Sequence, residues 1–278
     1  CFSLLILKPY LPASYFWSIL IGSGFISLIG FLDDLKGLSP FSRILAQIIF
    51  VYLVGYYLGA FWYIDYQTEI MKILFIFSFM VGSVWIMNTF NFIDGADGLL
   101  SINIILISLF SGILLFTQDQ IYLGLSLLIL ASVNLAFLIY NWAPAKVFMG
   151  DCGSLFLGSL FVIIPSYTVL NNLIPLYTWA ILLSVLYIET SVTLIFRLIK
   201  RKQIFKERHN YHAYQQLILS TQDHSAPAKM SILIQLFWTL PLSFVCYLFP
   251  HYGFSIFILT LLPMFFVFYY FGPKKAQG

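Results

Sequence analysis

Charged residues are scarce in this sequence: 9% of its 278 residues are Asp, Glu, Lys or Arg, whereas a typical soluble domain has about 25%. Because 61% of the residues are hydrophobic, the composition excludes an ordinary soluble domain. It also excludes a disordered chain, which needs low hydrophobicity and many charges. The three cysteines have no paired spacing, so neither a disulfide framework nor a zinc site is predicted. The net charge of +3 is small and the basic residues are clustered, so no nucleic-acid partner is expected.

Long apolar runs make up most of the chain, and runs of about 18 or more such residues predict helices that cross a bilayer. The chain is therefore expected to be an all-α polytopic membrane protein, with one integral membrane domain over residues 1–278. An apolar run at residues 1–7 indicates a further span that is truncated at the N-terminus. Nine complete spans are predicted, near residues 14–31, 43–64, 71–92, 99–117, 121–140, 155–170, 174–199, 230–248 and 253–271.

The basic residues predict the orientation of these spans. If the loop after the first complete span is cytoplasmic, 12 of the 14 Lys and Arg residues lie on that side, and only Lys8 and Lys72 lie outside it. Cytoplasmic loops of membrane proteins carry an excess of Lys and Arg. The same side holds the polar motifs described next, so the sequence predicts a site that opens to the cytoplasm.

The first motif is an acidic pair at a helix end, in the sequence GFLDDLKG at residues 30–37. Two adjacent carboxylates, Asp33 and Asp34, repel each other, and a bound cation or a role in proton transfer would explain why both are kept. The alternative is a solvated turn that ends a helix.

The second motif is a polar stripe at the end of an apolar span, NTFNFIDGADG at residues 88–98. On a helix Asn88, Asn91 and Asp94 share one face, and Asp97 follows if the helix persists. Such oxygen ligands suit Mg²⁺, which also binds substrate phosphates. A structural ladder of amides is the alternative, but it would not require two carboxylates beside the amides.

The third motif is NWAPAKVFMGDCGS at residues 141–154. Pro144 ends the preceding span, and the glycines on either side of Asp151 allow the backbone to approach a ligand closely. The helix that follows could direct its first amides at an anion. Phe148 offers a flat surface for a base or a sugar.

The fourth motif, ERHNYHAYQQL at residues 207–217, lies in the most basic loop. A short helix would put His209 and His212 on one side, and Arg208 could bind a phosphate through two hydrogen bonds. The alternative is an interfacial basic helix attracted to anionic lipids.

Together and in this order, the four motifs resemble those of the polyprenyl-phosphate N-acetylaminosugar-1-phosphate transferases, which form glycosyltransferase family 4. The resemblance covers residues 30–217. It implies transfer of an N-acetylaminosugar 1-phosphate from a UDP-sugar to undecaprenyl phosphate, with release of UMP, as the first membrane step of cell-surface polysaccharide assembly. It also implies a multi-pass enzyme of the bacterial inner membrane whose active site faces the cytoplasm, and it allows a homodimer.

The resemblance also implies a role for each motif residue. Mg²⁺, or Mn²⁺ in its place, would be bound by Asp151, with Asn91 or water completing its shell. Asp33 or Asp34 would orient or deprotonate the lipid phosphate, and these two residues with Asp151 form the implied catalytic set. The implied substrate-binding residues are Asp97, Asn141 and Phe148 for uracil, Asn88 and Asp94 beside the metal and diphosphate, and Arg208, His209 and His212 for the sugar and diphosphate.

Two sequence features bear on the finer assignment. The stretch HAYQ at residues 212–215 is similar to the O-antigen or exopolysaccharide branch of the family. Glu189 is the one carboxylate that falls well within a predicted span, and it is the main support for a different function, an ion-coupled secondary transporter that would bind Na⁺ or H⁺ near the middle of the bilayer.

Overall fold

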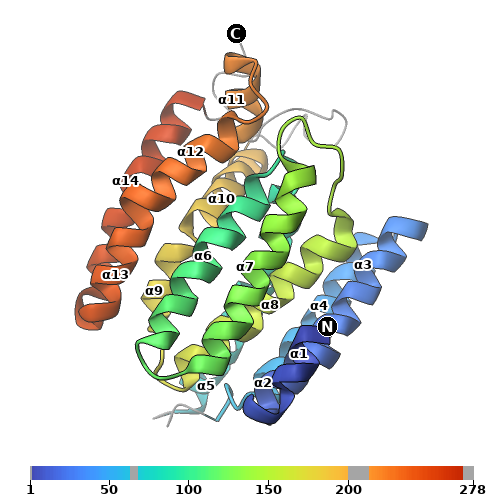
Figure 1. Ribbon diagram of the computed structural model, residues 1–278, viewed down its shortest axis with the longest axis vertical. Helices are drawn as coiled ribbons and strands as arrows, with labels where there is room; N and C mark the ends of the chain where they lie inside the picture. The colour runs from blue at the N-terminus through green and yellow to red at the C-terminus, as the bar shows by residue number, and fades with distance from the viewer. Residues whose placement is uncertain (1, 63–67, 200–212, 272–278) are drawn as a thin grey trace. The chain divides into compact units, whose positions relative to one another are not determined.

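The computed structural model describes residues 2–62, 68–199 and 213–271, and every regular element within these ranges is helical (Figure 1). Short 3₁₀ or π segments join some of the α-helices, at Lys8–Tyr10, Ser18–Ser23, Gln235–Thr239 and Pro250–Tyr252. The α-helices are α1 (Phe2–Leu7), α2 (Ala13–Trp17), α3 (Gly24–Lys36), α4 (Pro40–Tyr57), α5 (Glu69–Ile93), α6 (Leu99–Phe116), α7 (Ile121–Asn141), α8 (Gly150–Leu170), α9 (Leu176–Leu182), α10 (Ser184–Ile199), α11 (Ala213–Thr221), α12 (Ala226–Ile234), α13 (Leu240–Leu248) and α14 (Gly253–Phe271).

Within the described ranges, eight helical runs are long and apolar enough to cross a membrane, and a bent pair brings the number to as many as nine. The predicted all-α polytopic membrane fold is therefore confirmed. The bent pair lies where the sequence predicts one continuous span at residues 174–199. The structure divides that span at Leu183, and the two helices on either side of it, α9 and α10, meet at 70°.

The chain forms two compact units. The first consists of Cys1–Asp94, Gly112–Ile129 and Met149–Ile174, and the second consists of Gly95–Ser111, Leu130–Phe148 and Pro175–Gly278. The motif residues are divided between them. The first unit contains the acidic pair, the stripe from Asn88 to Asp94 and the Gly-Asp loop at the start of α8, whereas the second contains Asp97 and Asn141.

In the first unit, α8 packs against both α3 and α5, and α4 packs against α3 and α5. The contact between α8 and α5 is close because a Cβ added to Gly158 would lie 2.9 Å from the Cα atom of Met87. One turn further along each helix, the rings of Phe90 and Phe161 pack with their centroids 5.1 Å apart. These buried contacts fix the end of α5 beside the start of α8.

A tight connection between α3 and α4 aligns two further charged residues. Gly37, with φ of 64°, ends α3 in the left-handed conformation, and its amide donates to the carbonyl of Asp33. Ser39 then caps α4 by accepting a hydrogen bond from the Ser42 amide at 3.1 Å, and Pro40 occupies the first helical position. The short turn leaves Asp33 and Arg43 within reach of each other.

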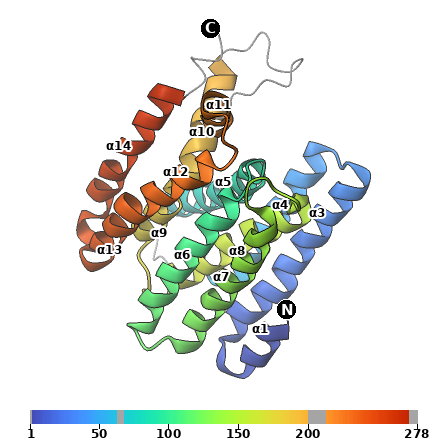
Figure 2. The ribbon, with the colours of Figure 1, turned by 45° about the horizontal axis from the view of Figure 1, so that its top comes forward.

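In the second unit, α13 and α14 pack against α9, and α14 also contacts α10 and α11 (Figures 1 and 2). The ring of Tyr177 on α9 lies 6.2 Å from that of Phe254 on α14, centroid to centroid. Gly253 is required at this contact because an added Cβ would lie 2.7 Å from the Tyr177 ring. The bent span is thus packed along its first half by the C-terminal helices.

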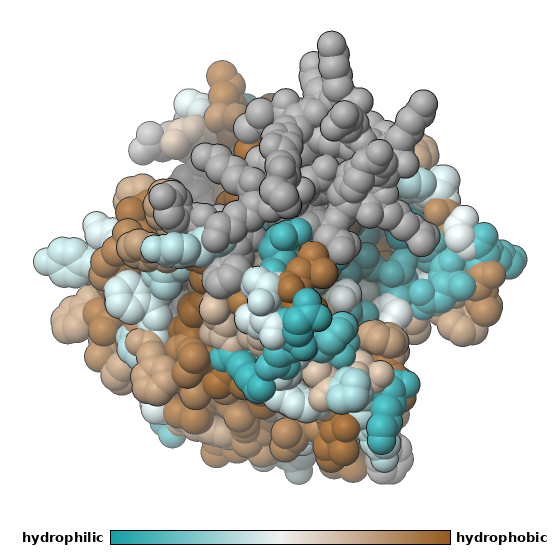
Figure 3. All heavy atoms as spheres, turned by 90° about the horizontal axis from the view of Figure 1, so that it is seen from above, coloured by the Kyte–Doolittle hydropathy of each residue, from teal (hydrophilic) through white to brown (hydrophobic). Residues whose placement is uncertain are grey.

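Large apolar side chains are exposed along several spans, as expected for helices that face lipid. On α5, for example, Ile73 and Phe77 are each 64% exposed. Hydrophobic residues make up much of the surface in view in Figure 3, and hydrophilic residues gather in patches on it. The exposed apolar side chains agree with a multi-pass membrane protein.

Candidate active site

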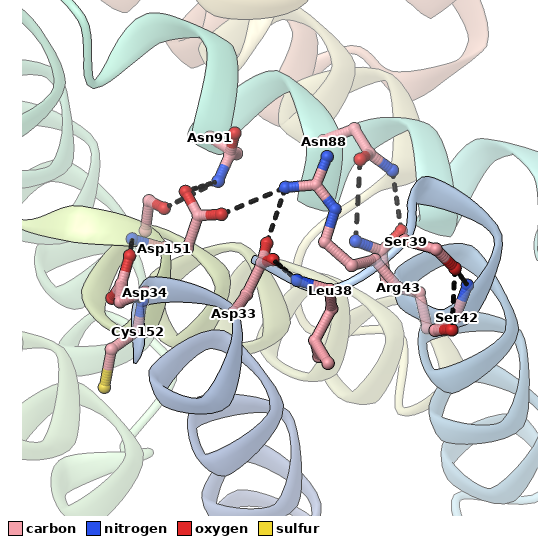
Figure 4. A network of polar contacts seen from close by, with 12 residues as sticks. Asp33, Asp34, Leu38, Ser39, Ser42, Arg43, Asn88, Asn91, Asp151 and Cys152 are labelled. Carbon is pink, nitrogen blue, oxygen red and sulfur yellow. Dashed lines mark hydrogen bonds and ion pairs between the residues drawn. The ribbon is translucent and has the colours of Figure 1, made fainter. Parts of the chain in front are cut away.

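The first turn of α8 is held by α3. The two carboxylate oxygens of Asp34 accept hydrogen bonds from the backbone amides of Asp151 and Cys152, each at 3.0 Å (Figure 4). Backbone amides at the start of a helix have no partner within the helix, and a carboxylate there also interacts favourably with the helix dipole. Gly150 adopts a φ of 70° beside this carboxylate. Asp34 therefore positions the Gly-Asp loop.

Backbone packing supports the same contact. A Cβ added to Gly30 would lie 2.7 Å from the carbonyl carbon of Asp151 and 2.8 Å from the Cα atom of Cys152. One turn earlier on α3, the hydroxyl of Ser27 lies 3.2 Å from the Cys152 sulfur. The backbones of α3 and α8 meet at Gly30, so this position tolerates only glycine without a shift of α8.

A shared guanidinium joins Asp33 to Asp151. Nη1 of Arg43 donates to Oδ2 of Asp33 at 2.6 Å and to Oδ2 of Asp151 at 3.0 Å (Figure 4). Asp33 is buried, and its other oxygen accepts from the Leu38 amide at 2.6 Å. Three helices, α3, α4 and α8, thus contribute one charged group each to a single cluster.

The polar stripe of α5 divides between two partners. Asn91 donates through Nδ2 to Oδ1 of Asp151 at 2.6 Å and to the Ser154 hydroxyl at 3.3 Å. Asn88, one turn earlier, donates to Oε1 of Gln47 at 2.7 Å and to the carbonyl of Val84 at 2.8 Å. Asn91 therefore belongs to the carboxylate cluster, whereas Asn88 connects α5 to α4.

Asp94 caps the C-terminus of α5 at the edge of this cluster. Burial raises the pKa of its carboxyl to about 7, although a hydrogen bond from the Gly150 amide opposes the shift. The negative charges of Asp151 and Asp34 contribute to this rise in pKa. The raised pKa reflects mainly the burial of this carboxyl, and its two anionic neighbours add to it.

Two polar residues of α4 that bond to motif residues are absent from those that the sequence motifs single out. Arg43 and Gln47 lie one turn apart on α4, and both side chains bond to motif residues of neighbouring helices. In the sequence, Arg43 is simply one of the basic residues on the side predicted to be cytoplasmic. The signal that could have identified the pair is an Arg and a Gln four residues apart in an otherwise apolar run, since polar groups there are costly unless paired.

In the second unit, two predicted residues hold the backbone of the loop before α8. Asp97 accepts a hydrogen bond from the Ala145 amide at 3.0 Å. Asn141 is buried, accepts from the Gly98 amide at 3.1 Å and donates to the Val147 carbonyl at 3.0 Å. These bonds order the loop that carries Phe148, whose side chain is 61% exposed. Arg208, His209 and His212 lie outside the described residues.

The carboxylate cluster fits a hard cation such as Mg²⁺ by the chemistry of its donors. Among the described residues, no three His, Cys, Asp or Glu side chains converge on a point that could hold a metal ion. Mg²⁺ does not need such a cage, because it is usually bound by one or two carboxylates together with waters and substrate phosphates. Asp151 and the side-chain oxygen of Asn91 would be the protein ligands that the family resemblance implies.

The architecture and this cluster define a class: a polytopic α-helical membrane protein with a carboxylate site at the ends of its spans. The comparisons with known proteins identify the family within that class. The sequence profile described as glycosyl transferase family 4 matches residues 16–169, more than half of the chain. The chain belongs to this family.

Curated relatives agree. The chain is 32% identical over 230 residues to a Bacillus subtilis protein named "Probable undecaprenyl-phosphate N-acetylglucosaminyl 1-phosphate transferase", with 78% of the chain and 61% of the relative covered. It is 31% identical over 214 residues to a phospho-N-acetylmuramoyl-pentapeptide-transferase of Streptococcus pneumoniae, with 68% of the chain and 61% of the relative covered. For the enzyme of the same name from Streptococcus thermophilus the coverage is 49% and 44%, at 31% identity. The chain spans about half to three fifths of these relatives.

Proposed function

We propose that the protein transfers a sugar 1-phosphate from a nucleotide-activated sugar to a polyprenyl phosphate in the membrane. The observation that carries this proposal is the cluster in which Arg43 joins Asp33 to Asp151. It combines a fixed cation with several carboxylates where spans end, which suits a reaction between a water-soluble diphosphate and a phosphate attached to a lipid. The names of the relatives support the same reaction class.

The reaction joins two anions. An oxygen of the lipid phosphate attacks the phosphorus that bears the sugar, a new P–O bond forms, and the P–O bond to the nucleoside monophosphate breaks. The nucleoside monophosphate leaves with the bridging oxygen. Because the reactants repel each other, the site must supply positive charge and hold both phosphates in line.

The contacts of the described residues suggest a separate role in the reaction for each charged group. Both oxygens of Asp34 are engaged by backbone amides of α8, so we assign Asp34 to positioning. Asp33 shares the guanidinium of Arg43 with Asp151, and we assign Asp33 to the lipid phosphate. Arg43 would counter the charge of the incoming phosphates. A magnesium ion held by Asp151 and Asn91 would supply further charge neutralisation on the diphosphate.

For the substrates we propose a UDP-N-acetylaminosugar and undecaprenyl phosphate, with UMP as the released product. The names of the relatives refer to an N-acetylglucosaminyl 1-phosphate and to a phospho-N-acetylmuramoyl-pentapeptide. Both groups contain an N-acetylated aminosugar. Asp97, Asn141 and Phe148 would hold the uracil. We further propose that the site faces the cytoplasm of a bacterial inner membrane and that the product initiates O-antigen or exopolysaccharide assembly, which rests on the basic loops and on the HAYQ stretch.

The test is release of UMP by the purified protein in nanodiscs that contain undecaprenyl phosphate. A panel of UDP-N-acetylaminosugars is offered with Mg²⁺, with Mn²⁺ and with EDTA. Release with one sugar, dependent on the lipid phosphate and abolished by EDTA, is the expected result. Asp151→Asn should abolish release, whereas Asp119→Asn, in the turn after α6, should not. Folded protein that releases no UMP with any sugar would overturn the proposal.

The structure bears on the transporter alternative as well. Glu189, the carboxylate on which that alternative depends, accepts a hydrogen bond from the Ala213 amide at 3.0 Å. It thus has a structural partner at the start of α11. Nothing in the described residues favours ion binding there, and the transferase is the function we propose.

A further inference from the structure

The break in the span formed by α9 and α10 is stabilised in part from within the span, because the Tyr187 hydroxyl donates to the Ala180 carbonyl at 2.9 Å. No Gly or Pro lies between Leu176 and Ile199, although sharp kinks usually occur at such residues or where a side chain enters the helical hydrogen-bond ladder. At the break, the Leu186 amide donates to the carbonyl of Leu183 at 3.0 Å. In an unbroken helix it would bond the carbonyl of Leu182 instead.

The carbonyl of Leu182 receives its hydrogen bond from another span. Nε2 of Gln235 donates to it at 3.2 Å, and also donates to Oδ1 of Asn103 at 2.9 Å. Gln235 is fully buried and opens the widened helical turn Gln235–Thr239 between α12 and α13. The bend takes the Leu186 amide away from this carbonyl, and an unsatisfied carbonyl is costly inside a membrane. The Gln235 amide replaces the lost donor and so stabilises the bent conformation.

The side chains that bond to Gln235 have further hydrogen-bond partners. Nδ2 of Asn103 donates to the Leu99 carbonyl at 2.8 Å and to the Ser231 hydroxyl at 2.7 Å, and the Thr239 hydroxyl bonds to Oε1 of Gln235. All of these side chains are buried. A fully connected buried network has one low-energy arrangement and therefore fixes the side chains that belong to it.

We infer that Gln235, oriented by Asn103, is a positioning residue that fixes the 70° bend at Leu183 and thereby the direction of α10. Helix α10 carries Glu189, which holds the start of α11 through Ala213. The other end of the network reaches Leu99, next to Gly98, whose amide is bound by Asn141. One buried network thus connects the bend to the backbone around Asp97 and Asn141, the residues proposed to hold uracil.

The consequence for catalysis rests on the proposed function, whereas the bend itself does not. Two measurements keep them apart. The first is the distance between spin labels on Leu176→Cys in α9 and Ile195→Cys in α10, two positions that are 62% and 55% exposed, in a background without the native cysteines. The second is UMP release with undecaprenyl phosphate and the UDP-sugar that the wild-type protein uses.

Gln235→Met keeps a similar volume but removes both donors, and we expect it to shift or broaden the label distance. Asn103→Leu removes the acceptor that orients Gln235 and should broaden the distribution. Thr260→Val is the matched control, because Thr260 is equally buried on α14 and bonds only to its own helix among the contacts described. It should leave the distance unchanged.

For the reaction, Gln235→Met should raise KM for the UDP-sugar by about tenfold, because small misplacements of binding groups are costly, while Thr260→Val should not. A Gln235→Met protein with the wild-type label distance would overturn the inference. A shifted distance with unchanged KM would overturn its catalytic part. If the wild-type protein itself releases no UMP while Gln235→Met still shifts the label distance, the proposed function is refuted and the role of Gln235 in the bend stands.

Discussion

Asp33 and Asp151, which are far apart in sequence and belong to different helices, are both bound to the same nitrogen of Arg43, at 2.6 and 3.0 Å. Two carboxylates this close would repel each other without the cation. The pairing therefore assembles the site before any substrate arrives. Both carboxylates bond one nitrogen, so the interaction depends on the positive charge of Arg43 and not on a two-nitrogen guanidinium geometry.

This geometry predicts different results for two substitutions of Arg43. Arg43→Met keeps much of the volume but removes the charge, and should lower the rate of UMP release by about 100-fold, the usual cost of losing an electrostatic group from an active site. Arg43→Lys should stay within about tenfold of wild type, because a single ammonium can donate to both carboxylates. Equal losses in the two variants would contradict the single-nitrogen role.

A second prediction concerns the contact between α3 and α8. Gly30→Ala places a methyl group against the backbone of Asp151 and Cys152, so α8 must shift and carry Asp151 with it. A displacement on the order of 1 Å can reduce turnover by about 100-fold. Gly24→Ala, in the same helix, meets nothing within 4 Å and serves as the control. Steady-state UMP release from both variants decides, and wild-type turnover in Gly30→Ala would refute the close contact.

The helical membrane fold could be predicted from the sequence because each span is a long apolar run, and the acidic motifs stood out because carboxylates at the ends of such runs are costly. The bend at Leu183 could not be predicted. It lies in the apolar run AILLSVLY, and the donor that accommodates it, Gln235, comes from a span some fifty residues later. Tyr187 of the same span also bonds across the break, but local sequence alone does not encode a break that depends in part on a distant side chain.

The candidate site was partly predictable for the same reason. The family resemblance of their motifs implied a common site for Asn91 and Asp151, and the structure brings the two side chains into contact. Asn88 shares the face of Asn91, yet it pairs with Gln47. The sequence pattern gives the face of a helix but not the helix that packs against it, so the partner of each amide had to come from the tertiary structure.

Asp97 can be tested with two variants that separate its charge from its hydrogen bond. Asp97→Asn keeps an oxygen for the Ala145 amide, whereas Asp97→Ala also frees the loop that carries Phe148. If these residues hold uracil, both variants should raise KM for the UDP-sugar. The Ala variant should show the larger rise, about tenfold or more, the usual cost of losing a hydrogen bond to a charged group. KM for undecaprenyl phosphate should not change, and a comparable rise for both substrates would exclude a uracil-specific role.

Asp94 predicts a pH-dependent effect on stability. Its folded-state pKa is about 7 and its ordinary value is 3.8, so between these values unfolding releases a proton and the free energy of unfolding falls as pH rises. Below the lower value there is no penalty, and above pH 7 the penalty is constant. Asp94→Asn keeps an acceptor for the Gly150 amide but cannot ionise. In EDTA, the variant should therefore melt at a higher temperature than wild type, and the gain in Tm should be larger at pH 8 than at pH 5. An equal gain at both pH values would show that the benefit comes from packing and not from the removal of a buried negative charge.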